Sequence, residues 1–291
     1  MKKLVLFFAI LWTGISFAQT TKKYDKKENF SENRAVVELN GKYGLIDKKG
    51  NEVAPCKYDK VWTFCNSRSI VKLNNKYGFI DGEGKEVIPL KYDMAGYFTD
   101  NRALVELNNK YGFIDPNGKE VIPVQYDNAS HSFSSFNEGL SWVKQNDKFG
   151  FIDEKGNEII PLKYDSVGDF NSARAWVKLN DKYGYIDKTG KEIIPIKLDR
   201  VNQFNSMNST MVVLNGKYVL INKSGKILSK EYDYADDGFS CGCIRVESGN
   251  KWGFIDGAGK EVIQLIYDKA SMFRNCEASV TLNGKEITIK R

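Results

Sequence analysis

Residues 110–127 read Lys-Tyr-Gly-Phe-Ile-Asp-Pro-Asn-Gly-Lys-Glu-Val-Ile-Pro-Val-Gln-Tyr-Asp, and close copies of this stretch recur along the chain. The copies of its Tyr-Gly-Phe-Ile-Asp core follow at intervals of 34, 34, 38, 34, 35 and 34 residues and begin at Tyr43, Tyr77, Tyr111, Phe149, Tyr183, Tyr218 and Trp252. A period of this size is typical of repeat proteins, whose units are too small to bury a core alone. We therefore expect one repeat domain over residues 19–291, with seven full units and a truncated eighth.

The residues within one unit follow the pattern of short antiparallel strands. Apolar side chains alternate with others over residues 103–107, the period of a half-buried strand. Asn108-Asn109 follows, and the same place elsewhere holds Asn-Gly, which favours a tight hairpin because both residues tolerate positive φ. A second strand over residues 110–115 carries the motif. We expect a third strand over residues 120–122 to end at Pro123, which has no N–H to donate.

The motif ends in a second recurrent turn, Asp115-Pro-Asn-Gly118. Its carboxylate can accept a backbone N–H of the turn, and its glycine can take the left-handed conformation. We assign these aspartates to turns and not to calcium, because lysines such as Lys48 and Lys155 stand where a calcium loop needs oxygen ligands. The glycine inside the motif, Gly78 for example, is expected to let another backbone or an aromatic ring approach closely.

These elements predict an all-β fold built from tandem three-stranded antiparallel meanders of about 34 residues. A lone meander is marginally stable in water, so neighbouring units must share their apolar side chains as a common core. We expect the meanders to stack in an open, curved array. A closed, propeller-like ring is the alternative, because such rings commonly complete one blade from both termini. Glu286 replaces the motif aromatic in the last unit, as suits a polar cap.

The repeated string resembles the WG repeat, a short β-rich repeat of bacterial proteins named for a Trp-Gly pair. The literal pair occurs at Trp252-Gly253, and tyrosine or phenylalanine replaces the tryptophan in the other units. The resemblance extends over nearly all of residues 22–291. It implies no established activity for individual residues, and it is loosely consistent with an extracytoplasmic or interaction role.

The N-terminus has the pattern of an export signal. Lys2 and Lys3 precede the apolar residues 4–15, and Ala18 ends a small-residue site for signal peptidase. We expect cleavage after Ala18, which makes residues 1–18 a signal peptide; an uncleaved anchor is the alternative. Cleavage removes two lysines and lowers the formal charge from +6 to +4. We therefore expect an exported protein of the periplasm, cell surface or secreted fraction.

Five cysteines are consistent with an oxidising compartment. Cys276 follows Cys241 and Cys243 by about one repeat, so stacking would place it beside one of them. We predict a disulfide from Cys276 to Cys241 or to Cys243, and spacing does not decide which. Cys56 and Cys65 are a weaker candidate pair.

One column of the first strand is the candidate ligand-binding site. It points away from the face that carries Ala103 and Val105, and its members are Val36, Ile70, Leu104, Trp142, Trp176 and Met211, followed by Arg245 and Ser279. If the column is exposed, Leu104, Trp142 and Trp176 form an apolar stripe that could stack on sugar rings or grip a peptide. The alternative is that the column is buried between units.

The function that these features favour is non-catalytic binding by a scaffold of the cell envelope or secreted fraction, with a protein or glycan partner. An enzyme acting on cell-wall glycan and a purely structural envelope component are the alternatives. We expect no catalytic residues, because His131 is the only histidine and no nucleophile motif accompanies it. We also expect no cofactor, no metal site, no nucleic-acid partner, no membrane span after cleavage, and a monomer.

Overall fold

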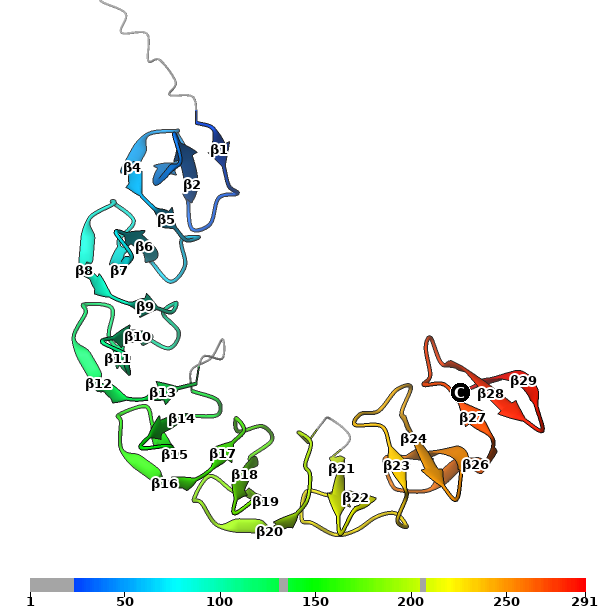
Figure 1. Cartoon of the computed structure of the whole chain (residues 1–291). Helices are drawn as coiled ribbons and strands as arrows, with labels where there is room; N and C mark the ends of the chain where they lie inside the picture. Colours follow the sequence, from blue (N-terminus) through cyan, green and yellow to red (C-terminus); the bar gives the residue numbers. More distant parts are fainter. Residues whose placement is uncertain (1–23, 131–135, 205–207) are drawn as a thin grey trace, which may run out of the picture.

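The computed structural model describes residues 24–130, 136–204 and 208–291, where all of the regular elements are β-strands. These strands form eight small antiparallel sheets arranged along an open arc whose ends do not meet (Figure 1). The predicted all-β open array is confirmed, and the ring is not formed. This part of the chain has no helix with the length and hydrophobicity to cross a bilayer. The predicted signal peptide, residues 1–18, and His131 lie outside the described residues.

A complete sheet contains four strands in chain order, which we call inner, entry, motif and outer. The inner strands are β1 (Lys26–Lys27), β5 (Lys60–Val61), β9 (Met94–Ala95), β13 (Asn128–Ala129), β17 (Ser166–Val167), β23 (Tyr234–Ala235) and β27 (Lys269–Ala270). The entry strands are β2 (Arg34–Leu39), β6 (Ser69–Leu73), β10 (Ala103–Leu107), β14 (Leu140–Gln145), β18 (Ala175–Leu179), β21 (Ser209–Leu214), β24 (Cys243–Ser248) and β28 (Glu277–Leu282).

The motif strands and the outer strands complete the sheets. The motif strands are β3 (Lys42–Asp47), β7 (Lys76–Ile80), β11 (Lys110–Ile114), β15 (Lys148–Asp153), β19 (Lys182–Ile186), β22 (Lys217–Asn222), β25 (Lys251–Asp256) and β29 (Lys285–Lys290). The outer strands are β4 (Glu52–Tyr58), β8 (Glu86–Tyr92), β12 (Glu120–Tyr126), β16 (Glu158–Tyr164), β20 (Glu192–Leu198) and β26 (Glu261–Tyr267). The expected three-strand meander is therefore extended by a two-residue inner strand, which is too short to leave an alternating pattern in the sequence.

Both predicted turns are confirmed. The entry and motif strands are joined by two residues with positive φ, as at Asn40 (52°) and Gly41 (72°), which is the geometry of a tight hairpin. After the motif strand, the Asp47 carboxylate accepts the backbone N–H groups of Lys49 and Asn51 at 2.8 and 2.9 Å. The motif aspartates are thus occupied as turn acceptors.

The outer strand continues through its proline, so the prediction that it ends at Pro123 is wrong. Pairing between β11 and β12 shifts from Phe113↔Ile122 to Tyr111↔Tyr126, which leaves a bulge at the proline. An outer strand lies at the edge of its sheet, where a missing N–H is tolerated. The bulge passes directly over the motif glycine: a Cβ on Gly112 would lie 2.7 Å from the carbonyl oxygens of Ile122 and Pro123.

Two units lack the motif glycine, and neither has a regular outer strand. Val219 takes its place in the sixth unit, where the following segment makes only the isolated bridges Tyr218↔Tyr232 and Ile221↔Ile227. Ile287 takes its place in the eighth unit, whose sheet ends at β29. A side chain fits at this position only where no bulged outer strand covers it. The other units therefore have glycine here because a Cβ would clash with the backbone of the bulge.

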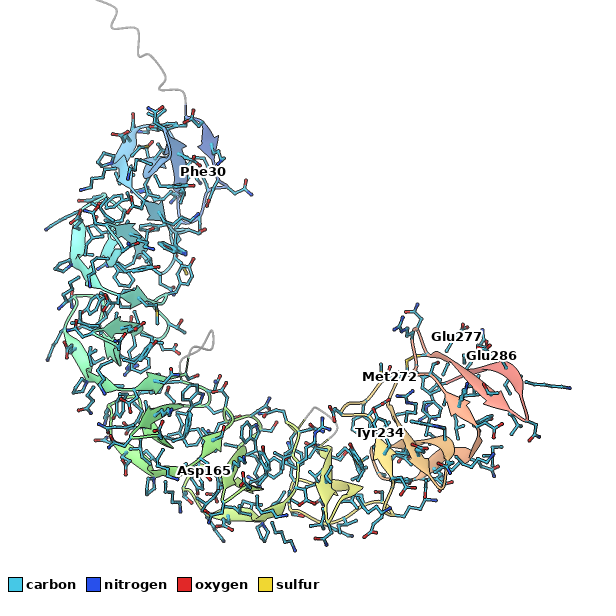
Figure 2. The ribbon with its side chains drawn as sticks, viewed as in Figure 1. Phe30, Asp165, Tyr234, Met272, Glu277 and Glu286 are labelled. Carbon is cyan, nitrogen blue, oxygen red and sulfur yellow. A yellow bond between two sulfur atoms is a disulfide. The ribbon has the colours of Figure 1, made fainter. Side chains whose placement is uncertain are left out.

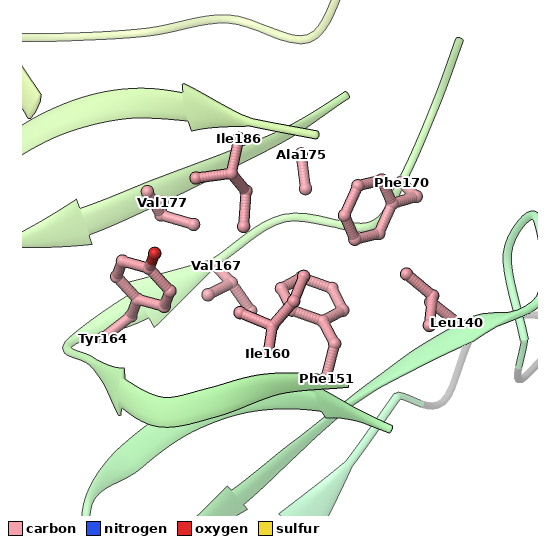
Figure 3. Packing of buried hydrophobic residues seen from close by; sticks show 9 residues of the cluster. All are labelled: Leu140, Phe151, Ile160, Tyr164, Val167, Phe170, Ala175, Val177 and Ile186. Atoms are coloured by element: carbon pink, nitrogen blue, oxygen red, sulfur yellow. The ribbon is translucent and has the colours of Figure 1, made fainter. Parts of the chain in front are cut away.

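Consecutive sheets pack face to face, so most of the core lies between units. One cluster takes Leu140, Phe151, Ile160 and Tyr164 from the fourth unit and Val167, Phe170, Ala175, Val177 and Ile186 from the fifth (Figure 3). The same division between neighbours recurs along the arc. Phe30 belongs to the first described sheet and is 37% exposed, whereas its equivalents Phe64 and Phe98, which pack against the sheet before them, are buried.

A column of ion pairs also joins neighbours. In the first seven units, the lysine that begins the motif strand binds an aspartate at the start of the next unit; the pairs are Lys42–Asp59, Lys76–Asp93, Lys110–Asp127, Lys148–Asp165, Lys182–Asp199, Lys217–Asp233 and Lys251–Asp268. The lysine hydrogen bond lowers the pKa of each of these carboxyl groups below its ordinary value. The other oxygen accepts a backbone N–H of the hairpin, as Asp93 does from Asn108.

Replacing a motif glycine by alanine should destabilise the array. In Gly78→Ala the new Cβ would lie 2.6 Å from the carbonyl oxygen of Ile88, so backbone must move, and we expect a loss of about 1–3 kcal/mol. Gly238→Ala is the matched control, because nothing lies within 4 Å of a Cβ there and its effect should stay within about 0.5 kcal/mol. Urea unfolding followed by circular dichroism measures both; equal stability of the two variants would contradict the steric role.

The Lys–Asp column predicts sensitivity to acid. The pKa values of these aspartates are depressed in the folded protein. Their contribution to the free energy of unfolding is therefore complete above the ordinary carboxyl pKa of about 3.9 and is lost as the pH falls through the folded pKa values. The thermal midpoint should stay level from about pH 7 to pH 5 and fall below about pH 4. Asp93→Asn should flatten part of that fall. A midpoint unchanged down to about pH 3 would refute the interpretation.

Candidate functional site

The concave side of the arc is formed by the loops between inner and entry strands, whereas β8, β12, β16 and β20 lie along its convex side (Figure 1). We call these loops the inner loops. Phe30 and Met272, which belong to inner loops near the two ends of the arc, are 37% and 49% exposed (Figure 2). The inner loops are therefore the part of each unit that faces the space enclosed by the arc.

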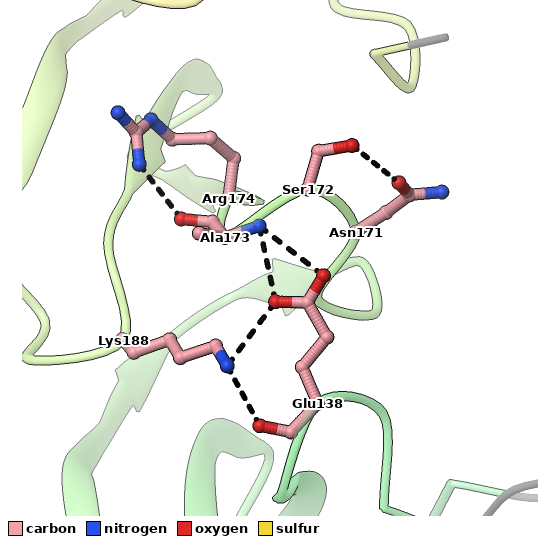
Figure 4. Close-up of polar contacts among 6 residues, drawn as sticks. All are labelled: Glu138, Asn171, Ser172, Ala173, Arg174 and Lys188. Atoms are coloured by element: carbon pink, nitrogen blue, oxygen red, sulfur yellow. Dashed lines mark hydrogen bonds and ion pairs between the residues drawn. The ribbon is translucent and has the colours of Figure 1, made fainter. Parts of the chain in front are cut away.

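Where the structure describes the end of an inner loop, the loop ends in a second tight turn, whose backbone N–H groups can hold an acceptor from the unit before. In the second unit Asn66 and Ser67 both have positive φ (51° and 60°), and both donate their N–H groups at 2.9 Å to the carboxylate of Glu32. Successive N–H groups in such turns form an anion-binding concavity. Glu138 makes the equivalent contact with the N–H of Ala173 at 3.0 Å (Figure 4).

Basic side chains at the ends of the inner loops also connect neighbouring units. Arg34 donates from Nε to the carbonyl of Gly82 at 2.6 Å, and Arg174 donates to that of Lys223, so each arginine reaches the motif turn of the next unit. The fourth unit has Leu140 at this place. There the contact is reversed: Lys188 of the next unit reaches back to the carbonyl of Glu138 at 2.9 Å and to its carboxylate at 3.3 Å (Figure 4).

The disulfide occupies the same position between two inner loops. The structure joins Cys241 to Cys276, which are 35 residues apart, like Glu32 and Ser67 and like Glu138 and Ala173. Of the two partners left open for Cys276, the structure selects Cys241, and Cys243 is a buried free thiol. Cys65 is an exposed free thiol, so the weaker Cys56–Cys65 pair is not bridged in the described residues.

The candidate column is divided between buried and half-buried positions. Leu104 is 4% exposed and belongs to the core between the third and fourth units, so it does not present an apolar surface to solvent. Trp142 and Trp176 are half-buried and pack against the motif aromatics Phe149 and Tyr183, with ring centroids 5.6 and 6.0 Å apart. The exposed stripe of three apolar residues is therefore not formed, because consecutive sheets cover this face.

Each column residue outside the sixth unit lies beside a residue that follows the inner strand and donates its backbone N–H to the column residue's carbonyl. The pairs are Glu28/Val36, Trp62/Ile70, Gly96/Leu104, Ser130/Trp142, Gly168/Trp176, Asp236/Arg245 and Ser271/Ser279. A Cβ on Gly168 would lie 2.1 Å from Nε1 of Trp176, so the glycine makes room for the indole. The tryptophans are thereby held in place by packing.

The described residues of adjacent inner loops form three shallow grooves. The groove at the fifth unit has a volume of about 310 Å³ and is lined by Asn137, residues 168–171, Trp176 and Gln203. We call it the Trp176 groove; it combines residues of the fourth, fifth and sixth units. The other two lie toward the ends of the arc, at Phe30 and Thr63 and at Met272 and Arg274.

The seventh unit replaces the apolar column with a charged pair. Arg245 donates to the Asp236 carboxylate at 2.9 Å and to the carbonyl of Ala270 in the eighth unit at 2.6 Å, and its guanidinium lies 4.7 Å from the Trp252 ring.

Across residues 24–130, 136–204 and 208–291, no three histidine, cysteine, aspartate or glutamate side chains converge as a metal site would require.

Sequence reasoning missed the residues of the inner loops. The residue before each core phenylalanine differs from unit to unit where the structure describes it: Asn29, Thr63, Tyr97, Asp169, Gln203, Gly238 and Met272. This variation was readable in the sequence once the repeats were aligned, but the side of the molecule that it occupies was not.

Comparison with known families gives a repeated match over most of the chain. The profile of the family described as "WG containing repeat" matches residues 21–43, 43–77, 77–111, 111–149, 149–183, 183–218, 220–252 and 252–285. None of the curated proteins is significantly similar to the chain in sequence.

Several solved structures resemble the chain weakly. A crystal structure of the eukaryotic initiation factor is 10% identical with a TM-score of 0.42, over 91% of this chain and 84% of that one. Hsv2p of Kluyveromyces lactis is 9% identical with a TM-score of 0.39, over 77% and 89%. PorZ, a bacterial surface component of the type-IX secretion system of Porphyromonas gingivalis, is 9% identical with a TM-score of 0.31, over 89% and 41%.

Removing the disulfide should loosen the last unit. The bridge spans 35 residues, and closing a loop of that size contributes about 3–4 kcal/mol in the chain-entropy description. Cys276→Ser should therefore lower the thermal midpoint under non-reducing conditions and abolish the effect of added dithiothreitol. Cys65→Ser, which removes an exposed free thiol, is the control and should change neither. Detection of free thiols at both Cys241 and Cys276 by non-reducing mass spectrometry would contradict the pairing.

Proposed function

The chain belongs to the family of WG-containing repeat proteins, and from this premise we propose that it is a non-catalytic binding scaffold whose concave side holds a protein or glycan. The observation that carries the proposal is the contrast between constant and variable positions of the repeat. The constant positions maintain the fold. The motif glycine lies under the bulge of the outer strand, the motif aspartate closes a turn, and the aspartate at the start of the next unit pairs with lysine.

The variable positions lie on the concave side. The residue before each core phenylalanine changes in size, charge and polarity between units, as in Thr63, Tyr97 and Asp169. Variation along this exposed edge supports recognition of a partner there, as in other open repeat proteins that bind along a concave surface.

The same contacts favour binding over catalysis. A glycan hydrolase needs two carboxyl groups with different roles at one site. In this chain the carboxylates that recur, such as Asp47 and Asp59, accept turn N–H groups or lysine hydrogen bonds in register with the repeat. We therefore propose no catalytic role and no cofactor.

We also propose that the protein is exported and monomeric. Residues 1–18 have the pattern of a signal peptide, and the Cys241–Cys276 bridge suits an oxidising compartment such as the periplasm or the cell exterior. The outward face of the last unit carries Ser279, Glu286 and Thr288 in place of the apolar residues that would continue the stack. Such a polar cap supports a single chain over a head-to-tail polymer.

A matched pair of substitutions tests which side binds. Gln203→Lys changes an exposed inner loop, and Gln125→Lys makes the same chemical change on the exposed convex strand β12. With a ligand identified from glycan arrays or envelope proteins, Gln203→Lys should weaken binding of the mature chain by about tenfold or more, and Gln125→Lys by less than twofold. Titration calorimetry gives both values. Equal affinities, or hydrolysis of a wall glycan by the purified chain, would overturn the proposal.

A further inference from the structure

The Trp176 groove has a side-chain chemistry that the other two grooves lack. Its polar lining consists of the amides Asn137, Asn171 and Gln203 and the carboxylate Asp169, and none of its lining residues is lysine or arginine. The grooves at the two ends of the arc each include basic residues, Lys27 in one and Arg245 with Arg274 in the other.

Amide side chains suit a particular kind of ligand. Each amide carries donor and acceptor atoms, and a hydroxyl group also donates and accepts. Gln203 donates from Nε2 to the Asp169 carbonyl at 3.2 Å, and Asn171 Oδ1 accepts from the Ser172 hydroxyl at 3.1 Å. The remaining donor and acceptor positions of these amides can satisfy hydroxyls of a ligand. Phosphate, sulfate and carboxylate ligands are instead recognised by arginine and lysine. The lining of the Trp176 groove therefore favours a neutral, hydroxyl-rich ligand over a polyanion.

The indole supplies a flat and preorganised apolar wall. The Trp176 indole packs against the backbone of Gly168 and its ring centroid lies 6.0 Å from that of Tyr183, so little side-chain freedom remains to be lost when a ligand binds. The C–H face of a sugar ring is apolar and can pack on an aromatic surface. Phe170, at 3% exposure, forms the base of the same groove.

The size of the Trp176 groove favours a short oligomer of ring-shaped units, such as a few linked sugars, over a folded protein. The volume of about 310 Å³ is at the lower limit of small-molecule sites, which usually run from about 300 to 1,000 Å³. A stable protein partner would need about 800 Å² of surface on each side. The lining comes from three successive units, so a ligand that fills the groove runs along the arc and crosses from Asn137 to Gln203.

We propose that the Trp176 groove binds a neutral oligosaccharide, with the indole packing on a sugar ring and Asn137, Asn171 and Gln203 hydrogen-bonding its hydroxyl or amide groups. The proposal rests on the proposed function and specifies the ligand class at one place on the concave side. The Asp169 carboxylate accepts from the Ser130 hydroxyl through Oδ1 at 3.2 Å and would accept from a ligand hydroxyl through its other oxygen. A cationic peptide is the competing ligand, since it would be attracted by the same carboxylate.

The test titrates the mature chain with chitotetraose and cellotetraose as neutral probes, tetralysine as the cationic probe and polygalacturonate as the polyanion. Calorimetry and tryptophan fluorescence report binding. We expect at least one neutral tetrasaccharide to bind, and the double variant Asn171→Ala/Gln203→Ala to weaken it by about tenfold or more. Gln125→Ala, on the exposed convex strand β12, should change it by less than twofold. The thermal midpoint shows whether each variant is folded.

Asp169→Asn separates the two ligand classes, because it removes the charge and keeps a hydrogen-bonding side chain. A sugar should bind this variant within about fivefold of the unchanged chain. Binding of tetralysine that Asp169→Asn abolishes would overturn the oligosaccharide proposal and leave the concave binding function standing. Failure of both neutral probes at about 10 mM, or sugar binding unaffected by the double variant, would also overturn it. The concave function itself is tested separately, by whether Gln203→Lys and Gln125→Lys bind alike and by whether the purified chain hydrolyses a wall glycan.

Discussion

Face-to-face burial between consecutive sheets is the constraint on which the structure depends. Both faces of an entry strand are occupied: Ala103 and Val105 pack toward the preceding unit, and Leu104 packs toward the following one. A single unit would expose both faces, so its stability is tied to its neighbours. The end units show the consequence, since Phe30 is partly exposed and the last unit replaces its outward apolar residues with Ser279 and Glu286.

Stacked units lie at a fixed spacing, so only certain combinations of side chains fit at each position between them. The chain uses several such combinations. A tryptophan on the column stands beside glycine or serine, as at Gly168/Trp176, whereas Trp62 stands beside the smaller Ile70. The contact between inner loops is made by a carboxylate at Glu32 and by a disulfide at Cys241–Cys276. Different chemistry at one geometric position indicates that the geometry, set by the stacked sheets, is what the array preserves.

Because the stacked sheets form most of the core, the inner loops contribute less to the packing between units. Their ends are tied by turn contacts, but the residue before each core phenylalanine lies in a concave-side loop and differs between units where the structure describes it. The scaffold therefore offers a rigid frame with adjustable side chains along one edge. The Trp176 groove is the place where that edge combines uncharged polar groups with a fixed indole.

Local features of this protein were determined by its sequence. The repeat, the Asn-Gly hairpins, the Asp-x-x-Gly turns and the close approach at Gly78 follow from conformational preferences within a few residues. The spacing of Cys276 also placed its partner one unit away. Only the tertiary structure decided that the partner is Cys241, that β12 continues past Pro123, that Leu104 is buried and that the variable residues gather on the concave side. Those outcomes depend on how one unit sits on the next, about 34 residues away along the chain, and a periodic pattern does not encode the relative placement of the units.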